Sequence, residues 1–285
     1  MPSEAIHQPG PWDMSLMASS LFSLGFVIDD GKSLPVPPVL SATDSGGCSA
    51  GDPCLGERID PTKVVPGPLG SVPMAPGPAA AAAAALAARD RVVAGLLDRY
   101  GPPRFGRPVK ASDRFAVLAR SICYQQLAGR AASTIHGRFV AAVGGEVTPA
   151  TVLAAAPEAL RAAGLSAAKA AAITDLAVKV TEGLVTLERI GRLSDEDVVA
   201  HLIQVRGIGR WTAEMFLLGT LGRLDIWPVG DYGVRAGFAG AWGLPEIPAP
   251  AVLLDLGEVF RPYRSIVAWY CWQVADDRTA IAEVS

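Results

Sequence analysis

The stretch LIQVRGIGRWTAEMFLL (Leu202–Leu218) decides the fold of this chain. Its pattern predicts an amphipathic helix that ends at Arg206, a tight turn at Gly207-Ile208-Gly209, and a second helix that begins near Arg210. The amides of such a turn and of the following helix start can point outward at an anion. The segment therefore predicts a helix–hairpin–helix that grips a phosphate through main-chain N–H groups, with no preference for base sequence.

A Gly-x-Gly sequence by itself could be only a helix-to-helix turn, so the prediction of a functional hairpin depends on the residues that follow it. The segment DIWPVGDYGVR (Asp225–Arg235) leads through Pro228 to a turn at Gly230, with Asp231 where the next helix should begin. A carboxylate there lies at the positive end of the helix, which favours its ionised form. Asp231 can serve as a helix N-cap in the same place.

The remainder of the chain after Arg89 is predicted to be helical. Its apolar residues recur at helical spacing, as in Val92, Val93, Leu96, Leu97 and Tyr100, and sustained alternating strands are absent. We therefore expect an all-α domain over residues 89–285.

Residues 1–88 have a different composition. They hold 13 Pro and 10 Gly, and three basic against eight acidic residues give a net charge of −5. We predict a mostly disordered acidic tail rich in Pro, Gly and Ala, in which Ala79–Ala85 either begins a helix or serves as a linker. The apolar run Met14–Ile28 has no Lys or Arg before it and is too short to span a bilayer, so we expect a cytoplasmic protein without membrane contact.

Overall charge excludes one class of nucleic-acid binder. Among 285 residues, 25 are Lys or Arg and 28 are Asp or Glu, a net charge of −3, which rules out a strongly basic DNA-coating protein. Residues 89–285 carry a net +2, so contact with phosphates must use a local patch or main-chain amides. Four scattered cysteines supply neither a disulfide scaffold nor a zinc site, and we expect free thiols and no metal.

The hairpin followed by Pro-Val-Gly-Asp231 resembles the helix–hairpin–helix, Gly/Pro-Asp superfamily of base-excision DNA glycosylases. Further segments are similar to the 3-methyladenine DNA glycosylase II, or alkylation-repair, branch of that superfamily. The segments that carry the resemblance are Val205–Ala213, Pro228–Asp231, Ile122–Leu127, Gly164–Lys169, Arg261–Ser265 and Trp269–Trp272. The resemblance covers roughly residues 90–275.

This resemblance implies two helical subdomains with an active cleft between them, flipping of a damaged base out of double-stranded DNA, and cleavage of its N-glycosidic bond. Asp231 would be the catalytic carboxylate. Bifunctional members carry a lysine directly after the hairpin where this chain has Trp211, so the resemblance implies a monofunctional enzyme that leaves an abasic site. The iron–sulfur branch has four closely spaced cysteines near its C-terminus, whereas this chain has only Cys271 there, so no cofactor is expected.

The resemblance also distributes roles among the other site residues. Gln126 would fill the space left by the flipped base, although the pair of glutamines could be only a solvated helix end. Tryptophans in a helical domain commonly have only a packing role, and this is the alternative for Trp211 and Trp272. The predicted DNA-binding residues are Arg206, Gly207, Gly209, Arg210, Thr212 and Gln126, and the predicted base-pocket residues are Gln125, Trp211, Trp272 and Tyr232.

Two other functions fit parts of the sequence. One is a glycosylase for oxidised or mismatched bases, which Trp211 and the missing cysteines disfavour. The other is a non-catalytic helix–hairpin–helix DNA-binding protein, which would have no need of Asp231 in its Pro-x-Gly-Asp context. We expect the protein to act as a monomer on double-stranded DNA with damaged bases, and to be associated with the nucleoid through DNA.

Overall fold

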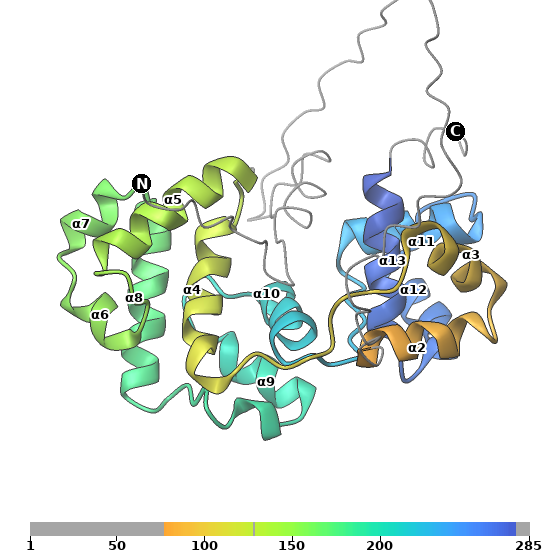
Figure 1. The fold of residues 1–285 in the computed structure, drawn as a ribbon, viewed down its shortest axis with the longest axis horizontal. Coiled ribbons are helices and arrows are strands. Elements are labelled where there is room, and N and C mark those ends of the chain that lie inside the picture. Colours follow the sequence, from red (N-terminus) through yellow and green to blue (C-terminus); the bar gives the residue numbers. More distant parts are fainter. Residues whose placement is uncertain (1–76, 128, 278–285) are drawn as a thin grey trace, which may run out of the picture. The chain divides into compact units, whose positions relative to one another are not determined.

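The computed structural model of the chain describes residues 77–127 and 129–277. Within these ranges the regular structure is entirely helical (Figure 1), which confirms the all-α prediction. None of the helices in this part of the chain is both long enough and apolar enough to cross a lipid bilayer.

The contacts sort the helices into two sets. In the first set, α4 packs on α5 and α8, and α6 and α7 pack on α8. Its members are η1 (Ala111–Asp113), α4 (Arg114–Tyr124), α5 (Gly129–Ala142), α6 (Pro149–Ala154), α7 (Pro157–Ala162), α8 (Ala167–Thr181), η2 (Ile190–Arg192), α9 (Asp195–Leu202), α10 (Arg210–Met215) and the π-helical turn η3 (Phe216–Thr220).

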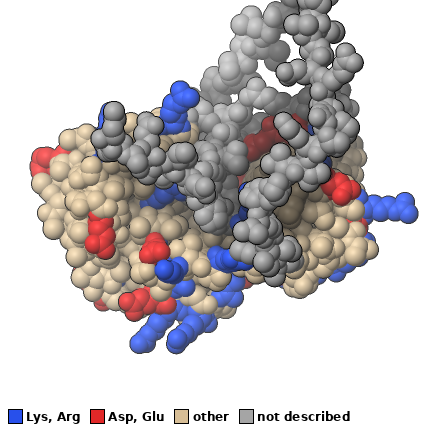
Figure 2. Space-filling model, in the orientation of Figure 1, with Lys and Arg blue, Asp and Glu red and all other residues tan. Residues whose placement is uncertain are grey.

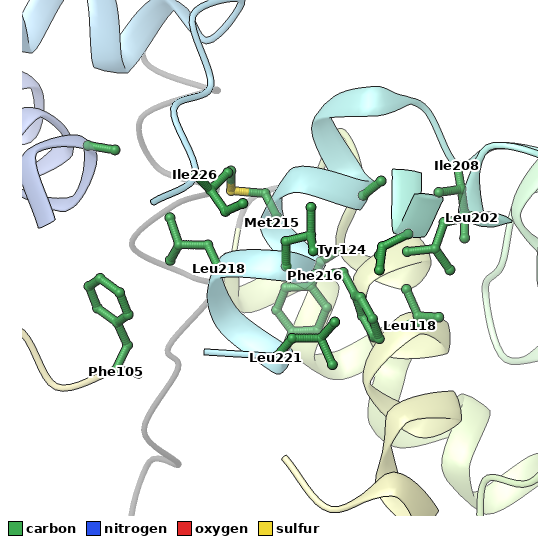
Figure 3. Packing of buried hydrophobic residues seen from close by; sticks show 14 of the residues in the cluster. Phe105, Leu118, Tyr124, Leu202, Ile208, Met215, Phe216, Leu218, Leu221 and Ile226 are labelled. Atoms are coloured by element: carbon green, nitrogen blue, oxygen red, sulfur yellow. The ribbon is translucent and has the colours of Figure 1, made fainter. Parts of the chain in front are cut away.

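In the second set, α11 packs along α13, and α2 packs on α3 and on α13. Its members are α2 (Pro78–Ala87), α3 (Arg91–Tyr100), α11 (Tyr232–Trp242), α12 (Pro250–Gly257), η4 (Glu258–Phe260) and α13 (Arg264–Asp276). Buried apolar side chains of both sets belong to one hydrophobic cluster, part of which Figure 3 shows around Met215, Phe216 and Leu218.

The described helical fold begins ten residues before the boundary predicted at residue 88. Helix α2 starts at Pro78, and its buried side chains Ala79, Ala82, Ala83 and Leu86 belong to the hydrophobic cluster. Because alanine is small, a run of alanines can pack closely on neighbouring helices without the alternation of large apolar and polar residues that marks an amphipathic helix. The rest of the predicted tail, including Met14–Ile28, lies outside the described residues.

Three glycines allow α11 to lie close to α13. Gly233, Gly237 and Gly240 follow one another at helical spacing, and a β-carbon on any of them would meet residues of α13. At Gly237 that β-carbon would overlap the backbone carbonyl of Cys271. The close approach brings the start of α11, where Asp231 lies, next to Trp272 of α13.

Candidate active site and DNA interface

Asp231 is the N-cap of α11, as the sequence predicts. Its Oδ1 accepts a hydrogen bond from the amide of Val234 at 2.8 Å, and its own amide donates to the carbonyl of Pro228 at 2.9 Å. The residue is only 5% exposed. The chain therefore holds a carboxylate in a nearly dry position at the positive end of a helix, where N–H dipoles stabilise its charge.

Two tryptophans complete the surroundings of this carboxylate. The indole Nε1 of Trp211, on α10, donates to Oδ2 at 2.6 Å, and Nε1 of Trp272, on α13, donates to Oδ1 at 3.0 Å. No lysine or arginine of residues 77–127 and 129–277 forms an ion pair with Asp231. The charge is thus held by three neutral donors, and it remains able to attract a positive charge that develops beside it.

The ionisable neighbours do not offer a nucleophile. Burial, together with the charge of Asp231, raises the pKa of the Cys271 thiol well above its usual value, so this thiol stays protonated near neutral pH. Burial likewise raises the pKa of the Glu214 carboxyl, although its ion pair with Arg210 opposes that shift.

The hairpin has the predicted turn with two differences. Helix α9 ends at Leu202, four residues before the predicted end at Arg206, whereas α10 begins at Arg210 as predicted. Gly207 has a φ of +75°, but Gly209 is the N-cap of α10 with an ordinary φ of −92°. Ile208 is 4% exposed and points into the same buried cluster as Leu202 (Figure 3), so it fixes the turn to the core while the two glycines stay exposed.

Side chains of the hairpin differ in their access to a phosphate. Arg206 is exposed, and the guanidinium of Arg210 is exposed but paired with Glu196 at 2.6 Å and Glu214 at 3.0 Å. Thr212 is 5% exposed, and its hydroxyl lies 3.5 Å from Nε2 of Gln125. The predicted DNA contact of Thr212 therefore does not fit its place on the inner face of α10, where it faces Gln125.

The two glutamines after α4 have separate environments. Gln125 is half-buried, and its Nε2 donates to the carbonyl of Gly207 at 2.9 Å, which ties the loop to the hairpin. Gln126 is exposed and has a φ of +55°, a left-handed conformation that residues other than glycine seldom adopt. Gln125, predicted to line the base pocket, thus contacts the hairpin, and Gln126 is presented to solvent.

The structure brings Asp231, Trp211 and Trp272 together through hydrogen bonds, with half-buried Tyr232 beside Asp231 in the chain. Gln125, Gly207 and Thr212 form a second group. Sequence reasoning did not assign a role to Lys169, whose Nζ donates to carbonyls at the end of α4. The Gly-Leu-Ser-x-x-Lys segment was a signal for it, because a lysine one turn into a helix can reach the carbonyls of a neighbouring helix end.

Comparison with known proteins identifies the family of this chain. Residues 119–262 match the HhH-GPD superfamily of base excision DNA repair proteins, a range that includes the glutamine loop, the hairpin and Asp231. The chain belongs to this superfamily. The HhH-GPD match and the described helices together confirm the predicted helix–hairpin–helix fold.

The similar proteins and solved structures within the HhH-GPD superfamily are named as 3-methyladenine DNA glycosylases or glycosidases. The chain is 34% identical over 183 residues to DNA-3-methyladenine glycosylase 1 of Schizosaccharomyces pombe, with 63% of this chain and 80% of that protein covered. Among solved structures, the S. pombe 3-methyladenine DNA glycosylase in complex with abasic DNA matches with a TM-score of 0.59 and 33% identity, over 68% of this chain and 95% of that chain. The DNA-3-methyladenine glycosidase of Bacillus halodurans also gives a TM-score of 0.59, with 32% identity over 67% of this chain and 86% of that chain.

Proposed function

We propose that this HhH-GPD protein is a monofunctional DNA glycosylase that flips alkylated purines of the 3-methyladenine type out of DNA and hydrolyses their N-glycosidic bond. The observation that carries the proposal is the buried carboxylate of Asp231, held by two indole N–H groups and one amide, with no cation among the described residues paired to it. The names of the relatives support the substrate class and support DNA as the partner.

Cleavage of a glycosidic bond places positive charge on the deoxyribose. A preorganised carboxylate in a site that excludes water stabilises that charge and can orient the attacking water. A purine alkylated at a ring nitrogen is already cationic and a good leaving group, so this single carboxylate suffices. An indole beside such a base attracts it by about 0.5–2 kcal/mol through its π face, a role that suits Trp211.

The surroundings of Lys169 and Lys179 support the monofunctional assignment. A bifunctional enzyme needs an amine that attacks the sugar, and Trp211 occupies the position after the hairpin where this would lie. The amine of Lys169 donates to the carbonyls of Cys123 and Gln125, and that of Lys179 to Asp175 and the carbonyl of Gln204. Both amines are thus engaged elsewhere, and we expect an abasic site without strand cleavage.

Binding to DNA in this proposal uses few charges. Basic and acidic side chains are interspersed on the face shown in Figure 2. We expect main-chain amides of the hairpin to bind a phosphate. Because few counterions would be released, we expect modest affinity with a shallow dependence on salt. We propose a monomer that acts in the cytoplasm, associated with the nucleoid through DNA.

One set of assays tests the function. Duplexes that carry methylated, oxidised or mismatched bases are incubated with the protein, and abasic sites are revealed by alkali. We expect breaks only after alkali and only at the methylated base. Preferential release of an oxidised or mismatched base would favour the other glycosylase class, and binding without any release would favour a non-catalytic DNA-binding protein.

Trp272→Phe tests the indole donors. The phenyl ring fills much of the same volume but cannot donate to Asp231, and a hydrogen bond to a charged group is strong enough for its loss to slow excision about tenfold. Single-turnover rates on the methylated duplex measure the effect. Trp242→Phe is the matched control, because Trp242 stacks on Phe238 and has no bond to Asp231. Equal rates for Trp272→Phe and the wild type would show that this donor is unimportant.

A further inference from the structure

Helix α8 holds the glutamine loop at its first turn. The Nζ of Lys169 donates to the carbonyl of Cys123 at 2.9 Å and to the carbonyl of Gln125 at 2.5 Å. These carbonyls lie at the C-terminus of α4, where helical hydrogen bonds run out and a cation interacts favourably with the helix dipole. The desolvation of Lys169 lowers the pKa of its amine, which shows that this contact is partly shielded from water.

The same helix holds the hairpin farther along. Oδ2 of Asp175 accepts from the amide of Arg206 at 2.7 Å, and Lys179 donates to Asp175 at 2.7 Å and to the carbonyl of Gln204 at 2.6 Å. Between them, Ala172 lies under the turn, since a β-carbon on Gly207 would be 3.2 Å from that of Ala172. Asp175 and Lys179 of α8 therefore hydrogen-bond the backbone of the hairpin segment, and Ala172 packs beneath its turn.

These four positions of α8 share one face. Residues 169, 172, 175 and 179 are separated by three, three and four positions, which is the spacing of neighbours on a helix surface. Lys169 and Asp175 are six positions apart, which corresponds to about 9 Å along the helix axis. The bond from Gln125 to the carbonyl of Gly207 closes the arrangement, so loop, hairpin and α8 form one hydrogen-bonded unit.

The backbone conformation of Gln126 indicates that this hydrogen-bonded unit fixes the glutamine loop. A left-handed backbone is unfavourable at a residue other than glycine, and it persists where the surrounding structure fixes it. Here the preceding residue, Gln125, is fixed through its carbonyl by Lys169 and through its side chain by the hairpin. The backbone of Gln126, from which its exposed side chain extends, is thereby fixed relative to the hairpin turn.

We propose that Lys169 is a positioning residue for base flipping, and that the α8 face fixes the glutamine loop (Gln125–Leu127) relative to the hairpin. This rests on the proposed glycosylase function, in which Gln126 enters the space of the extruded base. Lys169 touches neither base nor sugar in this account. It acts by placing Gln126 opposite the base that the hairpin has brought into register.

Lys169→Met and Lys169→Arg test this role, with one methylated base placed in two duplexes. In the first duplex the base is paired, and in the second it lies opposite an abasic site, where extrusion costs less. For Lys169→Met we expect single-turnover excision to fall about tenfold on the paired duplex and less than about threefold on the unpaired one, because a misplaced wedge matters most when a pair must be opened. Lys169→Arg can still donate to both carbonyls and should restore most of the rate.

The ratio of the two rates separates positioning from folding. An unfolded fraction lowers both rates equally and leaves their ratio unchanged, so an equal loss on both duplexes would overturn the positioning role. Lys110→Met is the control, because Lys110 is an exposed lysine outside the α8 face, and it should leave both rates and their ratio at the wild-type values. A ratio changed to the same degree in Lys110→Met would also overturn the positioning role. If the wild-type protein released no base from either duplex, the proposed function would fail instead.

Discussion

Asp231→Asn should lower the rate of base excision about 100- to 1,000-fold, the usual cost of removing a preorganised electrostatic group from an active site. Asparagine still caps α11, because its side-chain oxygen can accept the Val234 amide, so the fold should persist. The negative charge that faces the developing positive sugar is lost, and one of the two indole donors would meet an NH2 group. Binding to the methylated duplex should change by less than about threefold, since the hairpin amides hold the phosphates.

Single-turnover excision and a binding titration on the same duplex measure the two quantities separately. Asp90→Asn is the matched control, because Asp90 is also an N-cap whose side chain accepts an amide, that of Val93 at 2.9 Å. This control should retain the wild-type rate. Full activity in Asp231→Asn would show that another group carries the chemistry.

Among substitutions that add a single methyl group, Gly237→Ala should lower the free energy of unfolding the most. The new β-carbon would overlap the backbone carbonyl of Cys271, and a backbone cannot move aside as a flexible side chain can. We expect a loss of about 3 kcal/mol or more in the free energy of unfolding, and a fall in Tm of about 6–12 °C. Any folded fraction should have α11 displaced from α13, and with it the hydrogen bond between Asp231 and Trp272.

Thermal and denaturant unfolding measure this effect. Gly137→Ala on α5 is the control, because a β-carbon there meets nothing within 4 Å. It should raise stability by about 0.5–1 kcal/mol, since alanine is the better helix former. A Tm for Gly237→Ala equal to that of the wild type would mean that α11 and α13 do not pack as closely as described.

Local patterns in the sequence predicted the parts of the site that depend on neighbours along the chain. The turn at Gly207 and the cap at Asp231 each involve residues within four positions, so glycine and a capping carboxylate were sufficient signals. The boundary before α2 was missed because an alanine run has no alternation of large apolar and polar residues. The end of α9 was predicted too late because Val205 follows Leu202 at helical spacing and is apolar, as a core-facing helical residue would be. In the structure Val205 is buried but lies in the turn.

The long-range contacts of the site could not be read in this way. The indoles of Trp211 and Trp272 come from positions 20 and 41 residues away from Asp231, and only the packing of α10, α11 and α13 brings them to the same carboxylate. The burial of Thr212 depends likewise on which face of α10 meets the core. The resemblance to the glycosylase superfamily pointed to Trp211 and Trp272 as pocket residues, but it did not indicate that both indoles donate to Asp231.

A mass balance on methylated DNA tests the glycosylase assignment most directly. Free bases released by the wild-type protein are quantified by liquid chromatography and mass spectrometry, and abasic sites and strand breaks are counted in the same DNA. We predict free 3-methyladenine and abasic sites in equal amounts, no breaks before alkali, and an initial rate of formation of both products about 100- to 1,000-fold lower with Asp231→Asn. Methylated DNA that is bound but yields no free base would contradict the assignment.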